Sequence, residues 1–465
     1  MVFLPQAGQP VVGEDNCQVQ ASSFSTFQMD RKNRDSSQLR TRLLEQLTVQ
    51  SGLARAFGLL LAKIRLSSCP PTMEPIRILT AVPICDGHDS AINTVNLELI
   101  RHGIEVVYLG YHRSVEDIVR AAVQEDVRAI GISSYNGGHV EFFAEVLAEL
   151  RIRNGEHIKL FGGGGATITK ADAEQMYESG VDQIFFAGTP LDEMVDYVKR
   201  RFGAPVPRGE FGNLGNDRAL AAMLTRIENG EASRVLASLG NLRGPHRTKL
   251  FGFTGPGGAG KTTLIDEVVT RFIRHFPSDR RIAILSHDPS AVGLGALLGD
   301  RATMIYSQDD RIFIRSMATR GQAGGVSLVT EQSLRFLTGT EIFDAVLIET
   351  VGTGQEALPF DFAEMRLDAA FLVMPPDYGG RLQLHKIAMF DAADVIVINK
   401  SDLRGARTAM AEIEARIEPN RRGQRVLRIQ ANRHDDSGVD QLFEIMFPEK
   451  GTRAVESTPA TPGSF

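Results

Sequence analysis

Cysteine, tryptophan and long apolar runs are scarce or absent in this sequence, and each absence excludes a class of protein. The 465 residues contain no tryptophan and three cysteines, Cys17, Cys69 and Cys85, which form no C-x-x-C pair. An odd number of widely spaced cysteines argues against a disulfide framework and against a zinc site. Apolar stretches such as residues 56–62 are far shorter than the roughly 18 residues that a membrane helix needs. We therefore predict a cytoplasmic protein without membrane association.

An excess of positive charge is also missing. The formal net charge is -6, which does not favour a nucleic-acid surface. A chain of this length usually forms two or three domains. Residues 1–73 are rich in Ser, Gln, Asn and Arg, and we expect a disordered extension there, with translation from Met73 as a further hypothesis. A targeting presequence is disfavoured by acidic residues such as Glu45. We expect residues 451–465 to be a disordered tail.

Short apolar runs alternate with amphipathic stretches from Arg77 onward. The runs lie at residues 78–84, 104–109, 129–133, 158–161 and 183–186. Such alternation is typical of a parallel sheet covered by helices, and it predicts an α/β, flavodoxin-like (Rossmann-like) domain over residues 74–204. Ligands of this fold class bind outside the carboxyl ends of the strands.

Three loops at that predicted edge are polar or rich in glycine. Asp86, Gly87 and His88 follow the first apolar run, and Ser133 and Ser134 follow the third. The fourth run leads into four glycines, Gly162, Gly163, Gly164 and Gly165. Consecutive glycines leave no Cβ in the way of a flat group or a phosphate. For Asp-x-His alone, a capping loop with a surface histidine is the plainer interpretation. Three such loops at one edge favour a binding site.

These loops resemble those of a known family. Residues 86–91 are similar to the D-x-H-x-x-G signature of cobalamin-binding domains, with Ala91 in place of the last glycine. Residues 133–143 and 155–168 resemble the small subunit of isobutyryl-CoA mutase, particularly of its fused form. The resemblance implies adenosylcobalamin as the cofactor.

The same resemblance implies roles for the loop residues. His88 would be the lower ligand of cobalt, and Asp86 beside Gly87 would orient its ring. The cofactor's tail pocket would be lined by Ser133, Ser134 and the four glycines Gly162, Gly163, Gly164 and Gly165. His139 lies in a matching stretch and is a further candidate, although a solvated histidine is the plainer interpretation.

A phosphate-binding motif opens the second half of the chain. Residues 205–246 predict a helical linker, after which the run "TKLFGFTGPGGAGKTTL" begins. The G-x-x-x-x-G-K-[ST] pattern stands between an apolar run and a helical pattern, which is the context that a P-loop requires. Backbone N–H groups would hold phosphate oxygens, Lys261 would reach the β and γ groups, and Thr262 would bind Mg²⁺. The nucleotide-binding residues of this loop are Gly255, Gly257, Gly258, Ala259, Gly260, Lys261, Thr262 and Thr263.

Two later segments indicate the nucleotide. The run "FDAVLIET" contains Glu349, and an acidic-x-x-Gly element continues to Gly352. Another run ends in Asn399, Lys400 and Asp402. A carboxylate at that place can accept from both N–H groups of guanine, which adenine does not offer. We therefore predict a P-loop GTPase α/β domain over residues 247–450.

This half resembles the MeaB-like G-protein chaperones of the same mutases. The matching segments are residues 287–301, 349–356 and 399–405. The resemblance implies Mg²⁺ ligands at Thr262, Asp288 and Glu349, and catalytic roles for Lys261, Glu349 and Gln355. It also makes Arg315 or Arg320 a candidate for facing the phosphates, with an ordinary surface residue as the alternative. Residues 291–294 replace the family's basic or polar residues, so the response of this segment to nucleotide stays open.

The resemblance covers roughly residues 75–447, which correspond to the first half of a fused mutase. It implies a cobalamin-binding small subunit joined to a GTPase metallochaperone that loads and protects the cofactor. The mutase reaction would require a large subunit with the substrate-binding barrel, as a separate chain. The expected partners are that subunit, an adenosyltransferase, and a second copy through the GTPase domain. A stand-alone GTP-dependent delivery chaperone and a cobalamin-responsive regulatory protein are the alternatives.

Overall fold

The computed structural model describes most of the chain after the first 73 residues. The described ranges are 74–84, 90–165, 167–205, 214–239, 248–352, 359–379, 390, 393–417 and 423–448. The expectations for the first 73 residues and for the tail after residue 450 lie outside these ranges. So do the predicted cobalt ligand His88, its neighbours Asp86 and Gly87, and the predicted catalytic residue Gln355.

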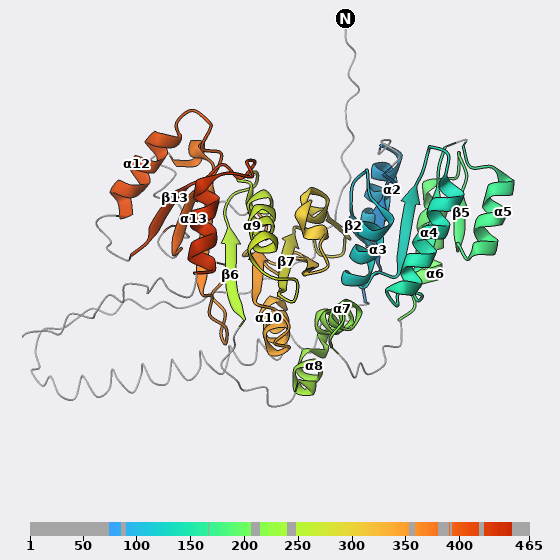
Figure 1. The fold of residues 1–465 in the computed structure, drawn as a ribbon. Coiled ribbons are helices and arrows are strands. Elements are labelled where there is room, and N and C mark those ends of the chain that lie inside the picture. The colour runs from blue at the N-terminus through green and yellow to red at the C-terminus, as the bar shows by residue number, and fades with distance from the viewer. Residues whose placement is uncertain are drawn as a thin grey trace, which may run out of the picture. The chain divides into compact units, whose positions relative to one another are not determined.

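The first part of the described chain is a parallel sheet between helices, which confirms the predicted fold class (Figure 1). Its strands are β1 (Arg77–Ala81), β2 (Glu105–Tyr108), β3 (Ala129–Ser133), β4 (Lys159–Gly163) and β5 (Gln183–Phe185). The helices are α2 (Ser90–Arg101), α3 (Val115–Gln124), α4 (His139–Ile152), α5 (Lys170–Ser179) and α6 (Leu191–Phe202). The sheet order is β5-β4-β3-β1-β2-β8 with every pair parallel, which is the flavodoxin-like order extended by one strand.

Local sequence signals account for these elements. All five residues of β1 are buried, as expected for a central strand covered by helices on both faces. The Ser114 side chain accepts from the Asp117 N–H at 3.1 Å and caps α3. Thr169 and Asp172 form a capping box at the start of α5. Because the strands of this sheet are parallel, their carboxyl ends lie at one edge, together with the described residues that follow β3 and β4.

The sixth strand of this sheet comes from a distant part of the chain. Strand β8 (Ala296–Leu298) pairs with β2, in register from Glu105 opposite Ala296 to Val107 opposite Leu298. Ala296 and Leu298 are buried in the same apolar cluster as the helices of the first sheet. No local pattern in the sequence predicts this pairing of β8 with β2.

The segment predicted as a linker contains helix α7 (Asp217–Arg226), a π-helical turn (Ile227–Glu231) and helix α8 (Ala232–Ser238). Leu220, Leu224 and Ile227 are fully buried and share an apolar cluster with the second sheet. This segment is thus helical, and its helices pack against the second sheet.

The second sheet carries the P-loop. Its strands are β6 (Lys249–Thr254), β7 (Ile282–Asp288), β9 (Ile312–Ala318), β10 (Ala345–Glu349), β11 (Ala369–Met374), β12 (Val395–Ile398) and β13 (Arg425–Arg428). They are parallel, in the order β13-β12-β11-β6-β10-β7-β9. The covering helices are α9 (Lys261–His275), α10 (Thr330–Gly339), α12 (Ala406–Ile417) and α13 (Ser437–Met446).

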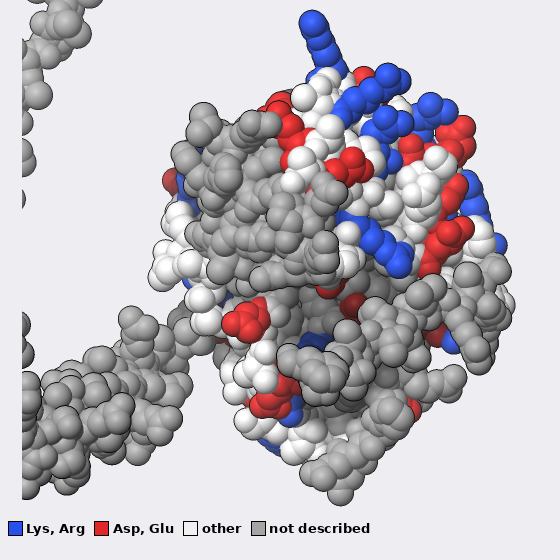
Figure 2. All heavy atoms as spheres, turned by 90° about the vertical axis from the view of Figure 1, so that its left-hand side faces the viewer, with Lys and Arg blue, Asp and Glu red and all other residues white. Residues whose placement is uncertain are grey.

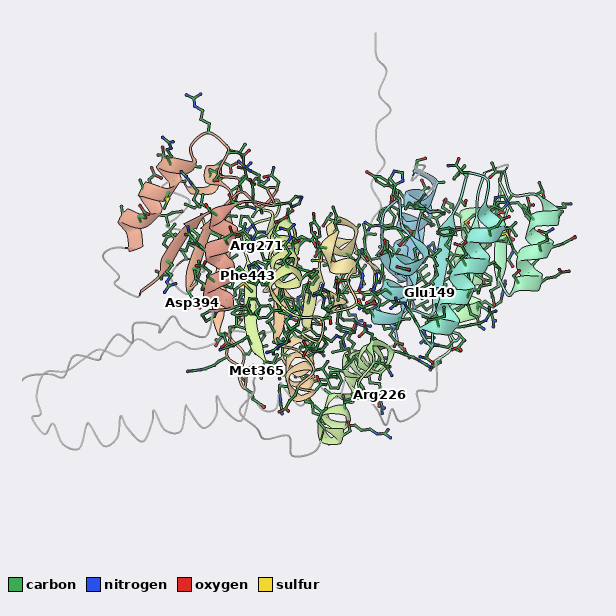
Figure 3. All side chains as sticks on the ribbon, viewed as in Figure 1. Glu149, Arg226, Arg271, Met365, Asp394 and Phe443 are labelled. Carbon is green, nitrogen blue, oxygen red and sulfur yellow. The ribbon has the colours of Figure 1, made fainter. Side chains whose placement is uncertain are left out.

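Helices α9 and α13 pack together beside this sheet. Arg271 and Phe443, labelled in Figure 3, belong to this contact. The Arg271 guanidinium donates to Asp440 Oδ1 at 2.7 Å, and the ring centroids of His275 and Phe443 lie 5.2 Å apart.

On the face drawn in Figure 2, the described residues carry interspersed basic and acidic side chains. Among the described residues, no helix has both the length and the apolar character needed to span a bilayer.

Candidate functional site

The P-loop connects the end of β6 to the start of α9 at Lys261. Gly255, Gly258 and Gly260 have positive φ values of 140°, 73° and 86°, a region that favours glycine. A Cβ on Gly255 would lie 1.9 Å from the Val373 carbonyl oxygen. At Gly257 and Gly258, by contrast, no described heavy atom lies within 4 Å of a Cβ position. The middle of the loop therefore leaves open space beside its backbone, and a phosphate group there stays a prediction.

Lys261 lies across its own loop. Its Nζ donates to the carbonyl oxygens of Gly255 (3.1 Å) and Pro256 (3.3 Å), and 6% of the residue is exposed. Burial lowers the pKa of Lys261, whereas the carboxylates of Glu349 and Asp300 act to raise it. Lys261 is thus held against the start of the loop, and its contact with the β and γ phosphates stays a prediction.

Buried carboxyl groups gather beside the first turn of α9. The Thr262 hydroxyl donates to Glu349 Oε1 at 2.6 Å. The Ser286 hydroxyl donates to Asp300 and lies 3.4 Å from Glu349 Oε2. Asp288 is 8% exposed, and its Oδ2 has no hydrogen-bond partner among the residues that the structure describes.

The carboxyl groups of this cluster disfavour one another's ionisation. Burial raises the pKa of Asp288 to about 8, and the carboxylates of Asp300 and Glu349 add to the shift. Burial likewise raises the pKa of Glu349 to about 8, with Asp300 adding to it and the Thr262 hydroxyl opposing it. A divalent cation would relieve this crowding of negative charge.

Three of these residues are the predicted magnesium ligands, Thr262, Asp288 and Glu349. Across the described ranges, no three His, Cys, Asp or Glu side chains form a group with metal-binding geometry. Magnesium usually takes one or two carboxylates together with water and phosphate oxygens. The residues present therefore fit Mg²⁺ as a partner of a bound nucleotide, and they do not form a metal site by themselves.

Asp300 is the residue that sequence reasoning missed. It begins a short 3-10 helix (Asp300–Thr303) after β8, and its carboxylate accepts from Ser286 in the cluster. The signal in the sequence is weak, since it consists of an acidic residue in "LLGDR" at the end of the segment that resembles the family. Asp300 joins the carboxyl cluster through its contact with Ser286 of β7.

The predicted base-specificity residues lie at the end of β12. Asn399 is buried, its Nδ2 donates to the Ala259 carbonyl oxygen at 2.9 Å, and its Oδ1 accepts from the Ala431 N–H at 3.0 Å. Asn399 thereby connects the P-loop to the loop after β13. Lys400, with a φ of 56°, and Asp402 are exposed to solvent, as is Thr263 in α9. The Asp402 carboxylate is thus accessible to a base.

The expectation that Arg315 or Arg320 faces the phosphates is wrong. Arg315 is 1% exposed and donates to Glu228 Oε1 at 2.6 Å and to the Glu125 carbonyl oxygen at 2.6 Å. Arg320 donates to Glu105 Oε1 at 2.9 Å. Buried carboxylates hold both guanidinium groups at the contact between the two domains. Local sequence patterns do not predict this contact, because the partners are far apart in the chain.

A cavity of about 470 Å³ lies at the carboxyl edge of the first sheet. Residues from α2 and from the ends of β1, β3, β4 and β5 line it, among them Thr80, Ile92, Ser133, Gly162–Gly165, Phe185 and Gly188. This volume is that of a small-molecule pocket, and its largely apolar wall with glycine backbone fits a flat heterocyclic group.

The four glycines of this edge are required by the protein itself. A Cβ would lie 2.5 Å from the Ile132 carbonyl oxygen at Gly162 and 2.6 Å from the Phe185 carbonyl oxygen at Gly163. At Gly164 it would lie 1.8 Å from the Ser134 carbonyl oxygen, and at Gly165 2.7 Å from the Tyr135 ring. The glycines therefore allow strands and loops to approach closely while their backbone forms a wall of the cavity.

Two further predicted residues lie beside the cavity wall. Ser134 is buried behind the glycine run, since its carbonyl oxygen is the atom that excludes a Cβ at Gly164. His139 is 8% exposed, lies 3.3 Å from Asp172, and is not among the described residues that line the cavity. His139 thus occupies a helix start beside the site.

Comparison with known proteins matches both domains to families. The family described as a B12 binding domain matches residues 76–195, and the methylmalonyl Co-A mutase-associated GTPase MeaB matches residues 220–452. The fused isobutyryl-CoA mutase of Cupriavidus metallidurans is 36% identical over 83% of this chain and 37% of its own length. That of Geobacillus kaustophilus is 37% identical over 74% of this chain and 33% of its own length.

A relative of the second half alone is a mitochondrial methylmalonic aciduria type A homolog of Mus musculus. It is 34% identical over 44% of this chain and 49% of its own length. The chain spans about a third of the length of the fused mutases that it matches. It belongs to the family of methylmalonyl-CoA mutase-associated GTPases, MeaB, with a B12-binding domain ahead of the GTPase domain as in the fused isobutyryl-CoA mutase type.

Proposed function

We propose that this chain binds adenosylcobalamin in its first domain, hydrolyses GTP in its second, and handles the cofactor of an acyl-CoA mutase. The observation that carries the proposal is the pairing of two sites in one folded unit. One is a P-loop with open space beside Gly257 and a cluster of buried carboxyls, and the other is a cavity of about 470 Å³ at a cobalamin-type sheet edge.

The residues of the GTPase site divide the work of hydrolysis. Backbone N–H groups of the P-loop and Lys261 would hold the phosphates, and Asp402 would accept from the guanine edge. In the reaction a water oxygen bonds to the γ-phosphorus, and the bond to the β–γ bridging oxygen breaks, which yields GDP and inorganic phosphate. Positioning and charge stabilisation account for most of such catalysis. Gln355 is the candidate for orienting the water.

Magnesium would be held by Thr262, Asp288 and Glu349 together with phosphate oxygens. When bound, Mg²⁺ supplies positive charge that stabilises the developing negative charge on the phosphate oxygens. The raised pKa values of Asp288 and Glu349 support this assignment, because buried carboxyls that crowd together require a cation to ionise at neutral pH. Asp300, hydrogen-bonded through Ser286, would belong to the surroundings of the ion.

Cobalamin would be held at the carboxyl edge of the first sheet. His88 would be the cobalt ligand, and Asp86 would orient it, as the D-x-H signature implies. Ser133 and the backbone of Gly162–Gly165 would contact the cofactor's tail in the cavity.

The mutase partner would be a separate chain. The fused relatives extend well beyond the region that this chain matches. We therefore propose a large, substrate-binding subunit as the partner, with an adenosyltransferase and a second copy of this chain as further partners. GTP hydrolysis would gate loading of the cofactor onto the mutase and removal of damaged cofactor.

An absorbance titration with adenosylcobalamin tests the cofactor assignment. We expect saturable binding and a base-off spectrum whose cobalt ligation changes in His88→Ala. The control is His102→Ala, because His102 is a surface histidine that hydrogen-bonds to the Glu98 carbonyl oxygen in α2. Absence of binding to wild-type protein would overturn the cobalamin half of the proposal and leave a GTPase chaperone.

A second measurement separates retention from delivery. Cobalamin-loaded protein is mixed with a mutase large subunit and GTP, and the corrinoid is followed by size-exclusion chromatography. Cobalamin that stays on this chain during mutase turnover supports the small-subunit function. Transfer to the partner on GTP hydrolysis would replace it with a delivery chaperone, and failure to bind any large subunit would favour a regulatory protein.

A further inference from the structure

Each domain covers the edge strand of the other domain's sheet. Strand β8, which follows the Asp288 loop in the GTPase half, pairs with β2 of the first sheet. In return, the end of α3 covers β9, the edge strand of the second sheet. Gln124 Nε2 donates to the Ile312 carbonyl oxygen (2.9 Å), and Gln124 Oε1 accepts from the Ile314 N–H (3.2 Å). The Gln124 amide thus hydrogen-bonds to backbone groups of β9 that would otherwise be available to another strand.

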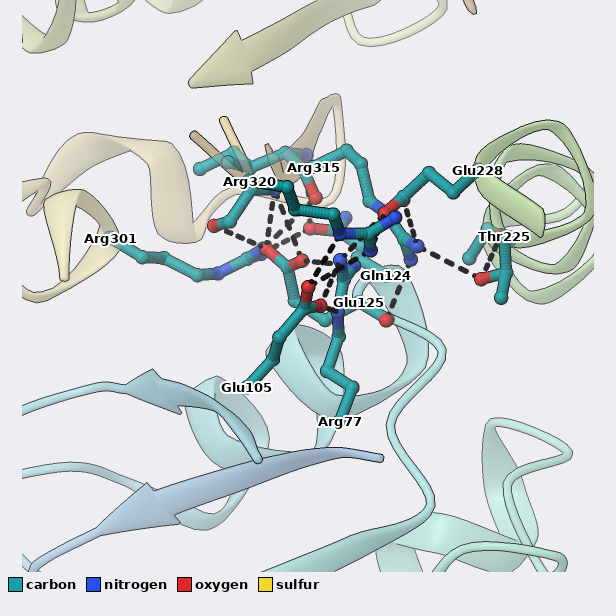
Figure 4. Close-up of polar contacts among 12 residues, drawn as sticks. Arg77, Glu105, Gln124, Glu125, Thr225, Glu228, Arg301, Arg315 and Arg320 are labelled. Atoms are coloured by element: carbon teal, nitrogen blue, oxygen red, sulfur yellow. Dashed lines mark hydrogen bonds and ion pairs between the residues drawn. The ribbon is translucent and has the colours of Figure 1, made fainter. Parts of the chain in front are cut away.

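Glu125 is the next residue and the centre of this contact (Figure 4). It is fully buried and accepts from the N–H and the hydroxyl of Ser316, the latter at 2.9 Å. Its Oε1 also accepts from Arg301 Nη1 at 3.0 Å. Arg301 is 1% exposed and donates in addition to the Ile314 carbonyl oxygen at 3.0 Å and to Gln124 Oε1. The Arg301 side chain is therefore anchored by the cobalamin-binding domain.

Arg301 is one peptide bond from Asp300, the carboxylate beside the proposed magnesium ligands. Asp300 accepts from Ser286, whose oxygen lies 3.4 Å from Glu349 Oε2. Asp300 and Arg301 are adjacent residues of one short 3-10 helix, so anchoring the Arg301 side chain restricts where the Asp300 carboxylate can lie. A short chain of contacts thus runs from Glu125 to the carboxyl cluster.

The other end of the same segment has a similar anchor. The Ser290 hydroxyl, two residues after Asp288, accepts from the Arg320 N–H at 2.7 Å. The Arg320 guanidinium donates to Glu105 Oε1 at 2.9 Å, and Glu105 lies in β2. Glu125 thus contacts one end of residues 288–301 directly through Arg301, whereas the link from Glu105 to the other end runs through Arg320.

We propose that Glu125, a residue of the cobalamin-binding domain, is a positioning residue for the magnesium site of the GTPase domain and acts through Arg301 on Asp300. The inference rests on the proposed GTPase function and names a regulator of that site. Residues that orient metal ligands from outside typically change metal affinity 10- to 100-fold when they are replaced. The GTPase would therefore require a docked cobalamin-binding domain to bind Mg²⁺·GTP well.

The test measures binding of a fluorescent GTP analogue to the full chain as Mg²⁺ is titrated. We expect Glu125→Gln and Arg301→Lys each to raise the Mg²⁺ concentration at half-maximal binding roughly tenfold or more. GDP binding in EDTA should change by less than about twofold, since the P-loop itself is intact. The double variant should be no weaker than either single variant, because both substitutions interrupt one chain of contacts.

Two matched controls separate positioning from simple support of the fold. Ser316→Ala removes another hydrogen bond of Glu125 without touching Arg301, and it should leave the Mg²⁺ dependence unchanged. Glu98→Gln makes the same chemical change at a surface pair with Arg101, and it should also have no effect. Thermal unfolding of each variant is followed in parallel.

The results distinguish failure of the positioning role of Glu125 from failure of the GTPase function. Wild-type dependence on Mg²⁺ in Glu125→Gln and Arg301→Lys would overturn the positioning role. Equal losses in Ser316→Ala, or loss of GDP binding in EDTA, would assign Glu125 to structural support and overturn it as well. If Glu125→Gln does not fold, Arg301→Lys decides. A wild-type chain that binds no GTP would overturn the GTPase proposal itself, and the inference with it.

Discussion

The two glycine-rich loops of this chain look alike in sequence, but they differ in the space beside their central glycines. In the loop of residues 162–165, a Cβ at Gly164 would lie 1.8 Å from the Ser134 carbonyl oxygen. In the P-loop, a Cβ at Gly257 would meet no described heavy atom within 4 Å. The protein's own backbone requires glycine at Gly164, as it does at Gly255 of the P-loop. Gly257 differs from both, because the space beside it is open.

The two sites also differ in electrostatics. The P-loop side gathers buried ionisable groups, and the pKa values of Asp288 and Glu349 are raised to about 8 by burial and by neighbouring carboxylates. The cavity at the first sheet is lined largely by apolar atoms and backbone. Binding at the P-loop should therefore depend on charge, and binding in the cavity of the first sheet should depend on shape. Substitutions at the two sites test this difference.

Lys261→Ala should lower the rate of GTP hydrolysis at least about a hundredfold, because it removes a charge aimed at the phosphates. The measurement is phosphate release under saturating GTP, together with cobalamin binding, which should not change. Lys249→Ala is the control, because Lys249 is a surface lysine paired with Asp368. Hydrolysis at the wild-type rate in Lys261→Ala would contradict the GTPase assignment.

Glu228→Gln should destabilise the contact between the two regions by about 3 kcal/mol or more, because it leaves buried guanidinium groups without their partner. Burial acts to raise the pKa of the Glu228 carboxyl. Three guanidinium groups outweigh burial and lower that pKa to about 2, namely those of Arg77, Arg315 and Arg320. The folded pKa is below the ordinary value of 4.5, so the stabilisation is complete above pH 4.5 and is lost as the pH falls towards 2.

Chemical denaturation at pH 6 and pH 3 checks both parts of this prediction. The difference in unfolding free energy between wild type and Glu228→Gln should shrink at pH 3. Glu231→Gln is the control, since Glu231 pairs with Arg226 at a more exposed site and should cost about 1 kcal/mol or less. A difference that is constant with pH would mean that the guanidinium groups do not stabilise the Glu228 charge.

Gly164→Ala should destabilise the first domain by about 3 kcal/mol, since the new methyl group would overlap the Ser134 carbonyl oxygen. Hydrogen exchange of the first domain measures this loss, and GTP binding to the second domain should be retained. Gly137→Ala is the matched control, because a Cβ there meets no described heavy atom within 4 Å. If both variants were equally stable, the packing account of the glycine run would be wrong.

Gly257→Ala should have the opposite profile and the smallest effect. The free energy of unfolding should stay the same or rise by about 0.5 kcal/mol, because the unfolded chain loses freedom. GTP affinity should fall about tenfold, which corresponds to about 1.4 kcal/mol. Binding of a fluorescent GTP analogue and thermal unfolding together give both values. A variant that is destabilised but binds GTP normally would reverse the comparison between the two loops.

Several features of the molecule were predictable because their signals are local. The alternation of apolar runs and helical patterns specifies parallel sheets, and the P-loop motif specifies a strand, a turn and a helix N-terminus. The pairing of Thr262 with Glu349 follows from these elements, since β6 and β10 are adjacent and both end at the P-loop edge. The roles of Arg315 and Arg320 and the importance of Asp300 were not predictable, because their partners are distant in sequence.

Local sequence patterns specify the type of each domain and the sheet edge where its ligand is expected. The spacing of apolar residues and of glycines acts through residues that are close together in the chain. Tertiary structure alone decided that β8 would complete the first sheet and that Gln124 and Glu125 would cover the second. An edge strand can pair with any segment that reaches it, and the choice depends on packing and buried charge over the whole molecule. Long-range contacts of that kind leave no periodic trace in the local sequence.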